Sequence, residues 1–441
     1  MKEILTCFYT AVCGRFLPAV LFVSGIYFSV RLMKYLIRIR FAAAVMKETG
    51  GGGDKTLSSL WLALGGTLGV GNICGVASAV MIAGPGCVFW IWVCALLSSV
   101  TKYSETVLAV AFKGKEESGR TVGGPYFYIR RIPVFGKLAP FFVVLTVLTA
   151  VFMGNITQVK SAADFAHSAL NIPPVASAFF FCTAVLVICT GKGKKVTDFT
   201  SATVPLLCVF YTILCIVIIV VNFEALGKVT ELIFREALTP KAAGGGITAI
   251  ITSKAFRSGL TRGIMSNEAG CGTAPIAYAS GSCDSAVKNG YLGISEVLID
   301  TLLLCTLTAY AILLTGAEAG GNSAQTVLDS FGTVFGNYGR IFLTLSVCLF
   351  ALASVSAWSF YVRQSLTVFR HAKEMTVVFS FIYPAVSFIG CFVSENKMWA
   401  MADISVSLMA IINITAVLLS FDKVMEMTAD KYKSFENKNW K

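Results

Sequence analysis

The sequence has little charge: aspartate, glutamate, lysine and arginine make up 14% of its 441 residues, whereas hydrophobic residues make up 56%. A soluble domain carries roughly 25% charged residues, and the mean hydropathy here is +0.75, so a soluble fold is excluded. Apolar runs of about 20 residues, long enough to cross a bilayer as helices, recur along the sequence and leave no segment for a separate soluble domain.

Catalytic motifs are also scarce. The histidines are His167 and His371, and neither H-E-x-x-H nor G-x-S-x-G occurs. The segment GGGGDKT at 50–56 resembles a phosphate-binding loop, but Asp54 stands where that motif requires glycine, and we interpret the segment as a flexible cytoplasmic linker. The 14 cysteines include no CxxC pair, so we expect packing residues rather than disulfides or metal ligands. The sequence does not predict an enzyme.

The apolar runs predict an all-α polytopic membrane protein with about eleven transmembrane helices. They lie near 16–36, 58–82, 87–112, 138–157, 175–190, 202–222, 245–265, 290–314, 338–362, 375–393 and 400–421.

The connections between these runs predict the orientation. Alternate connections are rich in lysine and arginine, and the positive-inside rule places such connections in the cytoplasm. The net charge of +12 therefore reflects topology rather than a nucleic-acid surface. We predict an N-terminus outside and a cytoplasmic C-terminus, which requires an odd number of spans. The first run is longer than a signal peptide core and precedes several basic residues, so we expect it to be retained.

Two stretches place glycines where a membrane helix is expected: GGTLGVGNICGVASA at 65–79 and SNEAGCGTAP at 266–275. Each glycine costs a helix about 1 kcal/mol relative to alanine. Without the first run, the remaining ten form two groups of five that begin near 58 and 245, so the second group must be inverted. Paired glycine-rich interruptions at matching positions indicate the binding site of a secondary transporter.

Unwound backbone in a membrane must line a cavity or be buried in protein, and the exposed helix ends can hold a carboxylate and a bare cation. We therefore predict a site for an amino acid and Na⁺. The alternative is that the glycines, such as Gly71 and Gly75, only permit close helix packing. A channel is a second alternative, but two unlike breaks within one chain favour an occluded site over a repeated filter.

Several motifs resemble those of the alanine or glycine:cation symporters, which are bacterial and archaeal carriers. They are GTLGVGNICGVASAVMIAGPGCVFWIWVCALL from Gly66, GGPYFYI from Gly123, the set Gly154, Asn155 and Gln158, SNEAGCGTAP from Ser266, IDT at 299–301, LFALASVSAW from Leu349 and LMAIIN from Leu408.

The resemblance implies a leucine-transporter-type 5+5 inverted repeat preceded by one extra helix. The expected division is 1–57 for the extra helix and linker, 58–222 and 245–421 for the repeats, 223–244 for an extracellular connection and 422–441 for a cytoplasmic tail. It further implies import of alanine or glycine with Na⁺, or alternatively H⁺, across the cell membrane by alternating access. No organic cofactor, nucleic acid or obligate protein partner is expected.

The same resemblance implies the site residues. For the substrate they are Thr67, Gly69, Gly71, Asn72, Gln158, Ser266, Asn267, Gly270, Gly272, Thr273 and Trp358. For Na⁺ they are Gly65, Leu68 and Ser354. The chain departs from the family pattern at Ala353, where a second hydroxyl is expected, and at Lys160, Val362 and Arg363.

Charged residues within the runs are costly and are usually paired or functional. Lys102 and Glu105, three residues apart, are expected to pair on one helix face. Asp300 has either a proton-relay role or a packing role. Glu268 has two alternative roles. It neutralises a bound cation or the ammonium group of the substrate, or it forms a gate near the cytoplasmic face by pairing with Arg257 or Arg262, and we favour the gate.

Overall fold

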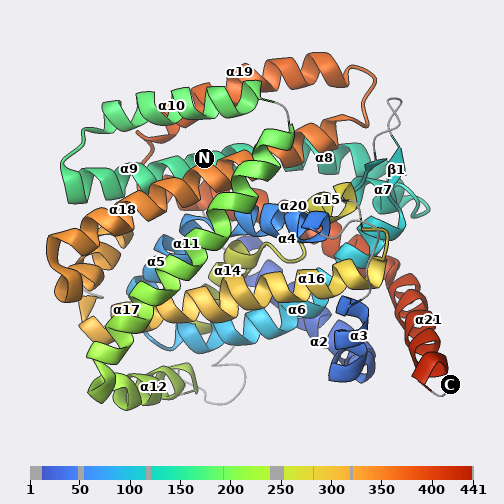
Figure 1. Cartoon of the computed structure of the whole chain (residues 1–441), viewed down its shortest axis with the longest axis horizontal. Coiled ribbons are helices and arrows are strands. Elements are labelled where there is room, and N and C mark those ends of the chain that lie inside the picture. The colour runs from blue at the N-terminus through green and yellow to red at the C-terminus, as the bar shows by residue number, and fades with distance from the viewer. Residues whose placement is uncertain are drawn as a thin grey trace.

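The computed structural model describes residues 12–47, 54–115, 121–191, 193–238, 253–281, 283–317 and 321–439. Within these ranges the chain is almost entirely helical, as the sequence predicts (Figure 1). The described strands, β1 (Gly114–Lys115) and β2 (Thr121–Val122), pair antiparallel with Gly114 opposite Val122.

The helices of the described residues follow one another along the chain. The helices are η1 (Val12–Phe16), α2 (Leu17–Leu36), α3 (Ile39–Lys47), α4 (Asp54–Thr67), η2 (Val70–Asn72), α5 (Cys74–Ala83), α6 (Cys87–Ala111), α7 (Pro125–Ile129), η3 (Phe135–Leu138), α8 (Ala139–Val151), η4 (Phe152–Ile156), α9 (Thr157–Leu170), α10 (Pro174–Thr190), α11 (Gly193–Val221), α12 (Phe223–Leu238), α14 (Lys254–Asn267), α15 (Ala274–Ser280), α16 (Ala286–Val297), η5 (Leu298–Cys305), α17 (Thr306–Thr315), α18 (Ser323–Leu366), α19 (Ala372–Gly390), α20 (Glu395–Leu419) and α21 (Phe421–Asn439).

Among the described residues, eight helices are long and apolar enough to cross a membrane, and the bent pair Leu57–Thr67 and Val70–Ala83 adds a ninth span if it counts as one. These nine correspond to nine of the predicted runs. The run near 175–190 forms α10, which has 17 residues. The run near 245–265 corresponds to α14, but its first residues, up to 252, lie outside the described residues. The count of eleven therefore stays a prediction.

Two connections contain more helix than the sequence suggests. The predicted extracellular connection holds α12, a 16-residue helix with buried residues on one face. α18 extends over 44 residues because two helices join at Gly336, which has a φ of 60°, a conformation that glycine adopts readily.

Residues 50–53 of the predicted linker lie outside the described residues, and α4 begins at Asp54.

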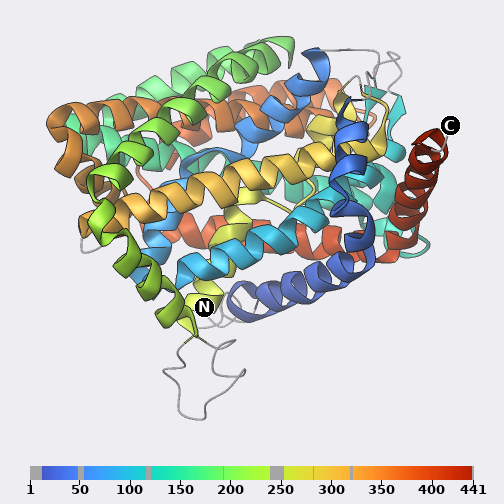
Figure 2. The same cartoon turned by 60° about the horizontal axis from the view of Figure 1, so that its bottom comes forward.

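The outer helices expose large apolar side chains. α10 and α19 lie side by side at one edge of the bundle (Figure 1), and Phe179, Phe180 and Phe381 on them are each more than half exposed. α2 lies along another edge (Figure 2), where Val23 and Val30 are exposed. Apolar surface of this extent is unusual on a soluble monomer and suits contact with lipid.

The interrupted helices occupy the interior of the bundle. α4, α5 and α14 are surrounded by other helices (Figures 1 and 2), and α6 packs against both α14 and α16. The glycine-rich stretches themselves are buried. Their irregular backbone is therefore enclosed by protein, as a membrane environment requires.

Candidate functional site

The first glycine-rich stretch breaks the second predicted span. α4 ends at Thr67 and α5 begins at Cys74, and the two halves differ in direction by 57°. Gly69 between them is extended, with φ −127° and ψ −153°. The Val70 amide donates to Oε1 of Gln158 at 3.0 Å, so a side chain of α9 satisfies a backbone group that the break leaves without a helical acceptor. A Cβ at position 69 would collide with Gln158.

The second stretch separates α14 from α15. Between these helices, Glu268, Gly270 and Gly272 have φ angles of 51°, 83° and 81°, which lie in the left-handed region that glycine adopts at little cost. The turn is held from α20, because Nδ2 of Asn413 donates to the Gly270 carbonyl at 2.9 Å. The glycines thus allow a change of direction that a regular helix does not make.

The two breaks meet at Asp300, a fully buried residue of the π-helix η5. From the first break, Nδ2 of Asn72 donates to the Asp300 carboxylate and, at 2.9 Å, to its main-chain carbonyl. From the second, the Ser266 hydroxyl donates to Oδ1 at 3.1 Å. The sequence reasoning leaves Asp300 outside the predicted site, although an acidic residue within an apolar run is a signal for function. The π-helix is a second such signal, but it is visible only in the structure.

The other predicted residues of the breaks are distributed around this junction. A Cβ on Gly71 would lie 3.5 Å from the Met265 carbonyl, so the first break runs against the end of α14. Asn267 points away from Asp300: its Nδ2 donates to Ser98 of α6 at 3.4 Å. Thr67 donates back to the Ala63 carbonyl within α4 at 3.3 Å.

Trp358 and Ser354 both lie on α18, and they contact η4 and the end of α4, respectively. The Trp358 ring packs so closely on Gly154 that a Cβ there would overlap it, and its Nε1 is buried without a hydrogen-bond partner among the described residues. Ser354 donates to the Gly66 carbonyl at 2.9 Å. Its hydroxyl therefore lies at the chain segment that holds Gly65 and Leu68, the other residues predicted for Na⁺. Ala353 is fully buried and offers no hydroxyl.

The departures from the family pattern at Lys160 and Arg363 have their own contacts. Lys160 pairs with Asp164 one turn further along α9. Arg363 donates to the Gly191 carbonyl at 3.1 Å and to Ser380 at 3.2 Å, which links the end of α18 to α10 and α19. Lys160 thus pairs within its own helix, and Arg363 binds neighbouring helices.

The predicted pair of Lys102 and Glu105 is confirmed, with Nζ and Oε1 4.0 Å apart. Lys102 also pairs with Glu296 of α16 at 3.3 Å, a partner that the sequence does not predict. Tyr278 of α15 donates to Glu296 at 2.9 Å, and Asn413 of α20 donates to Glu105 at 2.6 Å. This buried network joins α6, α15, α16 and α20 on one side of the second break.

The predicted pairing of Glu268 with Arg257 or Arg262 is absent from the described residues. Thr273 donates to Glu268 at 2.7 Å, because the left-handed conformation of Glu268 turns the chain back toward α15. Arg262 instead pairs with Asp403 of α20 at 3.3 Å, and its guanidinium lies 4.3 Å from the centre of the Trp399 ring. The gate that we expect at Glu268 therefore has no ion pair with Arg257 or Arg262 among the described residues, and its position near the cytoplasmic face stays a prediction.

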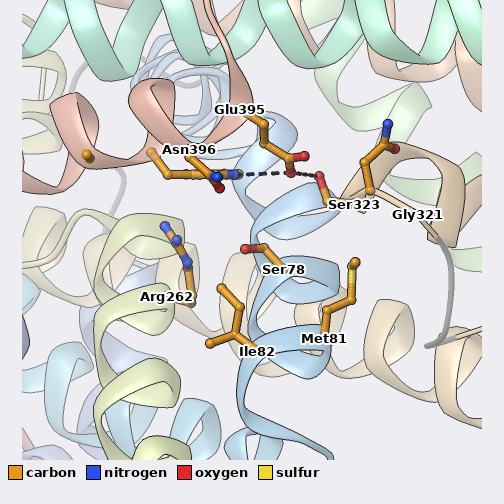
Figure 3. Close-up of a pocket in the computed structure, with 11 residues that line it drawn as sticks. Ser78, Met81, Ile82, Arg262, Gly321, Ser323, Glu395 and Asn396 are labelled. Carbon is orange, nitrogen blue, oxygen red and sulfur yellow. Dashed lines mark hydrogen bonds between the residues drawn. The ribbon is translucent and has the colours of Figure 1, made fainter.

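A pocket of about 330 Å³ lies beside Arg262 (Figure 3). Its wall includes Ser78 and Met81 of α5, Ser323 of α18 and Glu395 of α20, and the Ser323 hydroxyl donates to Glu395 at 2.5 Å. A second pocket, of about 290 Å³, lies next to Arg262 and Asp403 and is lined by Lys254 and Arg257. Of the predicted site residues, only Arg257 and Arg262 line these two pockets.

The whole chain, residues 1–441, matches the model of the sodium:alanine symporter family. An uncharacterized transporter of Haemophilus influenzae is 32% identical, with 98% of this chain and 96% of that protein aligned. The sodium/alanine symporter AgcS of Methanococcus maripaludis is 28% identical, with 95% and 94% aligned.

Among solved structures, that of MhsT in complex with L-phenylalanine resembles this chain with a TM-score of 0.58 at 14% identity, covering 82% of this chain and 88% of MhsT. This likeness concerns the fold, and it supports the leucine-transporter-type architecture that the resemblance implies. The match over the full length, with the two broken helices at its centre, leads to one conclusion: the chain belongs to the sodium:alanine symporter family.

Proposed function

We propose that this chain imports alanine or glycine together with Na⁺ by alternating access. Membership of the family makes it a multi-pass membrane protein and a cation-coupled amino acid transporter rather than an enzyme. The observation that carries the finer proposal is the junction of the two broken helices, where Asn72 and Ser266 both donate to Asp300.

The proposed substrate site lies at the first break. The amides that precede α5 and the positive end of that half-helix suit a carboxylate, and Thr67, Gly69, Gly71 and Asn72 line this segment. The second break contributes Ser266, Asn267, Gly270, Gly272 and Thr273. Gln158 packs closely on Gly69, and Trp358 packs closely on Gly154. This packing favours alanine or glycine over larger amino acids.

The proposed Na⁺ site is formed by the carbonyls of Gly65 and Leu68 and the hydroxyl of Ser354. The hydrogen bond from Ser354 to the Gly66 carbonyl supports this assignment, because it brings the hydroxyl to the end of α4. H⁺ as the coupling ion is the alternative. One Na⁺ moving down a potential of about 100 mV releases about 2.3 kcal/mol, which supports roughly fifty-fold accumulation of a neutral amino acid.

We further propose eleven spans, with two inverted groups of five that begin at α4 and at the span containing α14, an extracellular N-terminus and a cytoplasmic C-terminus in the cell membrane of a bacterium or archaeon. The occurrence of one glycine break in the first span of each group supports this arrangement. In this orientation the pair of Arg262 and Asp403 is the extracellular gate, and the network around Lys102 lies toward the cytoplasm.

Uptake into proteoliposomes tests the proposal. Radiolabelled alanine and glycine should accumulate when a Na⁺ gradient is imposed and should equilibrate without accumulation when K⁺ replaces Na⁺. A pH gradient alone distinguishes H⁺ coupling. Uptake that does not depend on any cation gradient, together with ion conductance in the absence of substrate, would exclude a symporter.

A further inference from the structure

One side of α14 carries polar and cationic side chains. Lys254, Arg257, Ser258, Thr261 and Arg262 follow one another at steps of three, one, three and one residues, a spacing that places them on the same side of a helix. All five line the second pocket described above, which has a volume of about 290 Å³. This pocket is called the α14 pocket below.

The charges around the α14 pocket are unbalanced. Three cationic residues line it with one acid, Asp403, and Asp403 pairs with Arg262 at 3.3 Å. Neither Lys254 nor Arg257 has a carboxylate oxygen of the described residues within 4.0 Å. Both lie in the first turn of α14, which begins at Lys254, and the helix dipole is positive at that end. The pocket therefore attracts negative charge.

The guanidinium group of Arg257 gives an independent indication of a ligand. Its Nε is buried and has no hydrogen-bond partner among the described residues, although buried donors are normally paired. A guanidinium binds a carboxylate through two parallel N–H donors, and the hydroxyls of Ser258 and Thr261 on the same wall are further donors. These groups suit an anion that accepts several hydrogen bonds at once.

We propose that the α14 pocket binds a small monovalent anion through Lys254, Arg257 and the hydroxyls of Ser258 and Thr261. Two sources share this chemistry: chloride, and the carboxylate of an amino acid that approaches the carrier. The pocket is separate from the proposed substrate and Na⁺ sites, because none of their residues lines it. The anion site rests on these contacts and charges, whereas a substrate carboxylate as its occupant also rests on the proposed function.

Nuclear magnetic resonance of the purified full chain in a nonionic detergent tests the site. Exchange with a protein site broadens the ³⁵Cl⁻ line, and saturation transfer detects bound propionate, a carboxylate that lacks the ammonium group of alanine. Na⁺ is held constant, with the bulky anion morpholinoethanesulfonate as the replacement. We expect saturable binding of at least one probe to wild type. Alaninamide, which lacks the carboxylate, should not displace it.

The two probes distinguish the two sources. Chloride broadening that propionate does not reverse identifies chloride as the occupant. Propionate binding without chloride broadening identifies a carboxylate, and alanine should then displace propionate. Displacement of each probe by the other shows that the pocket accepts both anions.

Four variants assign the binding to the pocket. Arg257→Gln removes the charge and should weaken binding at least about tenfold, because hydrogen bonds to charged groups are strong. Arg257→Lys keeps the charge without the two parallel donors and should retain part of the affinity. Lys254→Gln should also weaken binding, and it carries the test if Arg257→Gln does not fold, because Lys254 is exposed. Arg235→Gln in α12 is the matched control, since Arg235 is exposed and does not line the pocket.

A wild-type chain that binds neither probe would overturn the proposal, and so would wild-type affinity in Arg257→Gln. Equal weakening in Arg235→Gln would attribute the binding to the overall charge of the protein and would also overturn the site. The proposed function is judged separately from uptake. Proteoliposomes that accumulate alanine with Na⁺ would uphold it without an anion site, whereas anion binding without such accumulation would uphold the site alone.

Discussion

Arg262 of α14 and Asp403 of α20 form a buried ion pair, with Nη1 and Oδ1 3.3 Å apart, and the Trp399 ring lies against the same guanidinium. The two residues are far apart in the sequence, and their contact joins the first part of a broken helix to the last predicted span. Arg262 lines two pockets, one of which is also lined by Glu395 and the other by Lys254 and Asp403.

Removing one partner of this pair should loosen the contact between α14 and α20. Asp403→Asn leaves Arg262 buried without its counter-charge, which costs about 3–5 kcal/mol for a buried pair. We expect faster hydrogen exchange of the backbone amides in 254–264 and at the start of α20, together with reduced alanine uptake. Asp329→Asn serves as the control, because it removes a partner of Arg340 in a more exposed ion pair of α18. Exchange in 254–264 that equals wild type would show that the pair does not hold the two helices together.

Gln158→Ala should weaken alanine binding by roughly tenfold or more, because the buried Val70 amide loses its acceptor and an unsatisfied group costs about 1–3 kcal/mol. Gln158→Glu keeps an oxygen at this position and should therefore bind alanine more tightly than Gln158→Ala does. Asn72→Ala should have a similarly large effect. Calorimetric titration of the purified variants measures these affinities, and wild-type values in Gln158→Ala and Asn72→Ala would remove both residues from the site.

Gly154→Ala should abolish uptake while leaving the protein in the membrane, because its Cβ would overlap the Trp358 ring and force that side chain from the wall of the proposed site. Gly227→Ala in α12 is the control, since a Cβ there meets nothing within 4 Å. Alanine also favours the helix by about 1 kcal/mol, so this control should be at least as stable as wild type. Normal uptake by Gly154→Ala would argue against a tightly packed site.

The Na⁺ dependence of uptake should respond to the side chains at 353 and 354. Ser354→Ala removes a proposed ligand and should raise the Na⁺ concentration for half-maximal uptake by about tenfold, because a hydrogen-bonding group contributes about 1 kcal/mol or more. Ala353→Ser adds a hydroxyl beside it and should lower that concentration. Opposite shifts, or none, would place Na⁺ elsewhere.

Sequence periodicity and glycine content predicted much of the architecture. Long apolar runs lead to helices in a membrane because every backbone group must be satisfied within the chain, and nine of the predicted runs have counterparts among spans that are long and apolar enough. The pairing of Lys102 with Glu105 was also predictable, since residues three apart share a helix face. These predictions rest on rules that relate residues close together in the sequence.

The contacts that assemble the site are not local. Asn72 and Asp300 are 228 positions apart, and Arg262 and Asp403 are 141 apart. No spacing rule connects such residues, and the π-helix that orients Asp300 has no periodicity signal of its own. The contact of Arg262 with Asp403 could not be predicted for the same reason, because Asp403 comes from a helix that the sequence cannot place beside Arg262.

The hydrogen bond between Gln158 and the Val70 amide has a consequence for how tightly a substrate is held. Gln158 fixes the unwound backbone at Val70 before any substrate arrives. Binding therefore does not have to order this segment first, and the free energy of the substrate contacts is not offset by the entropy of ordering the break.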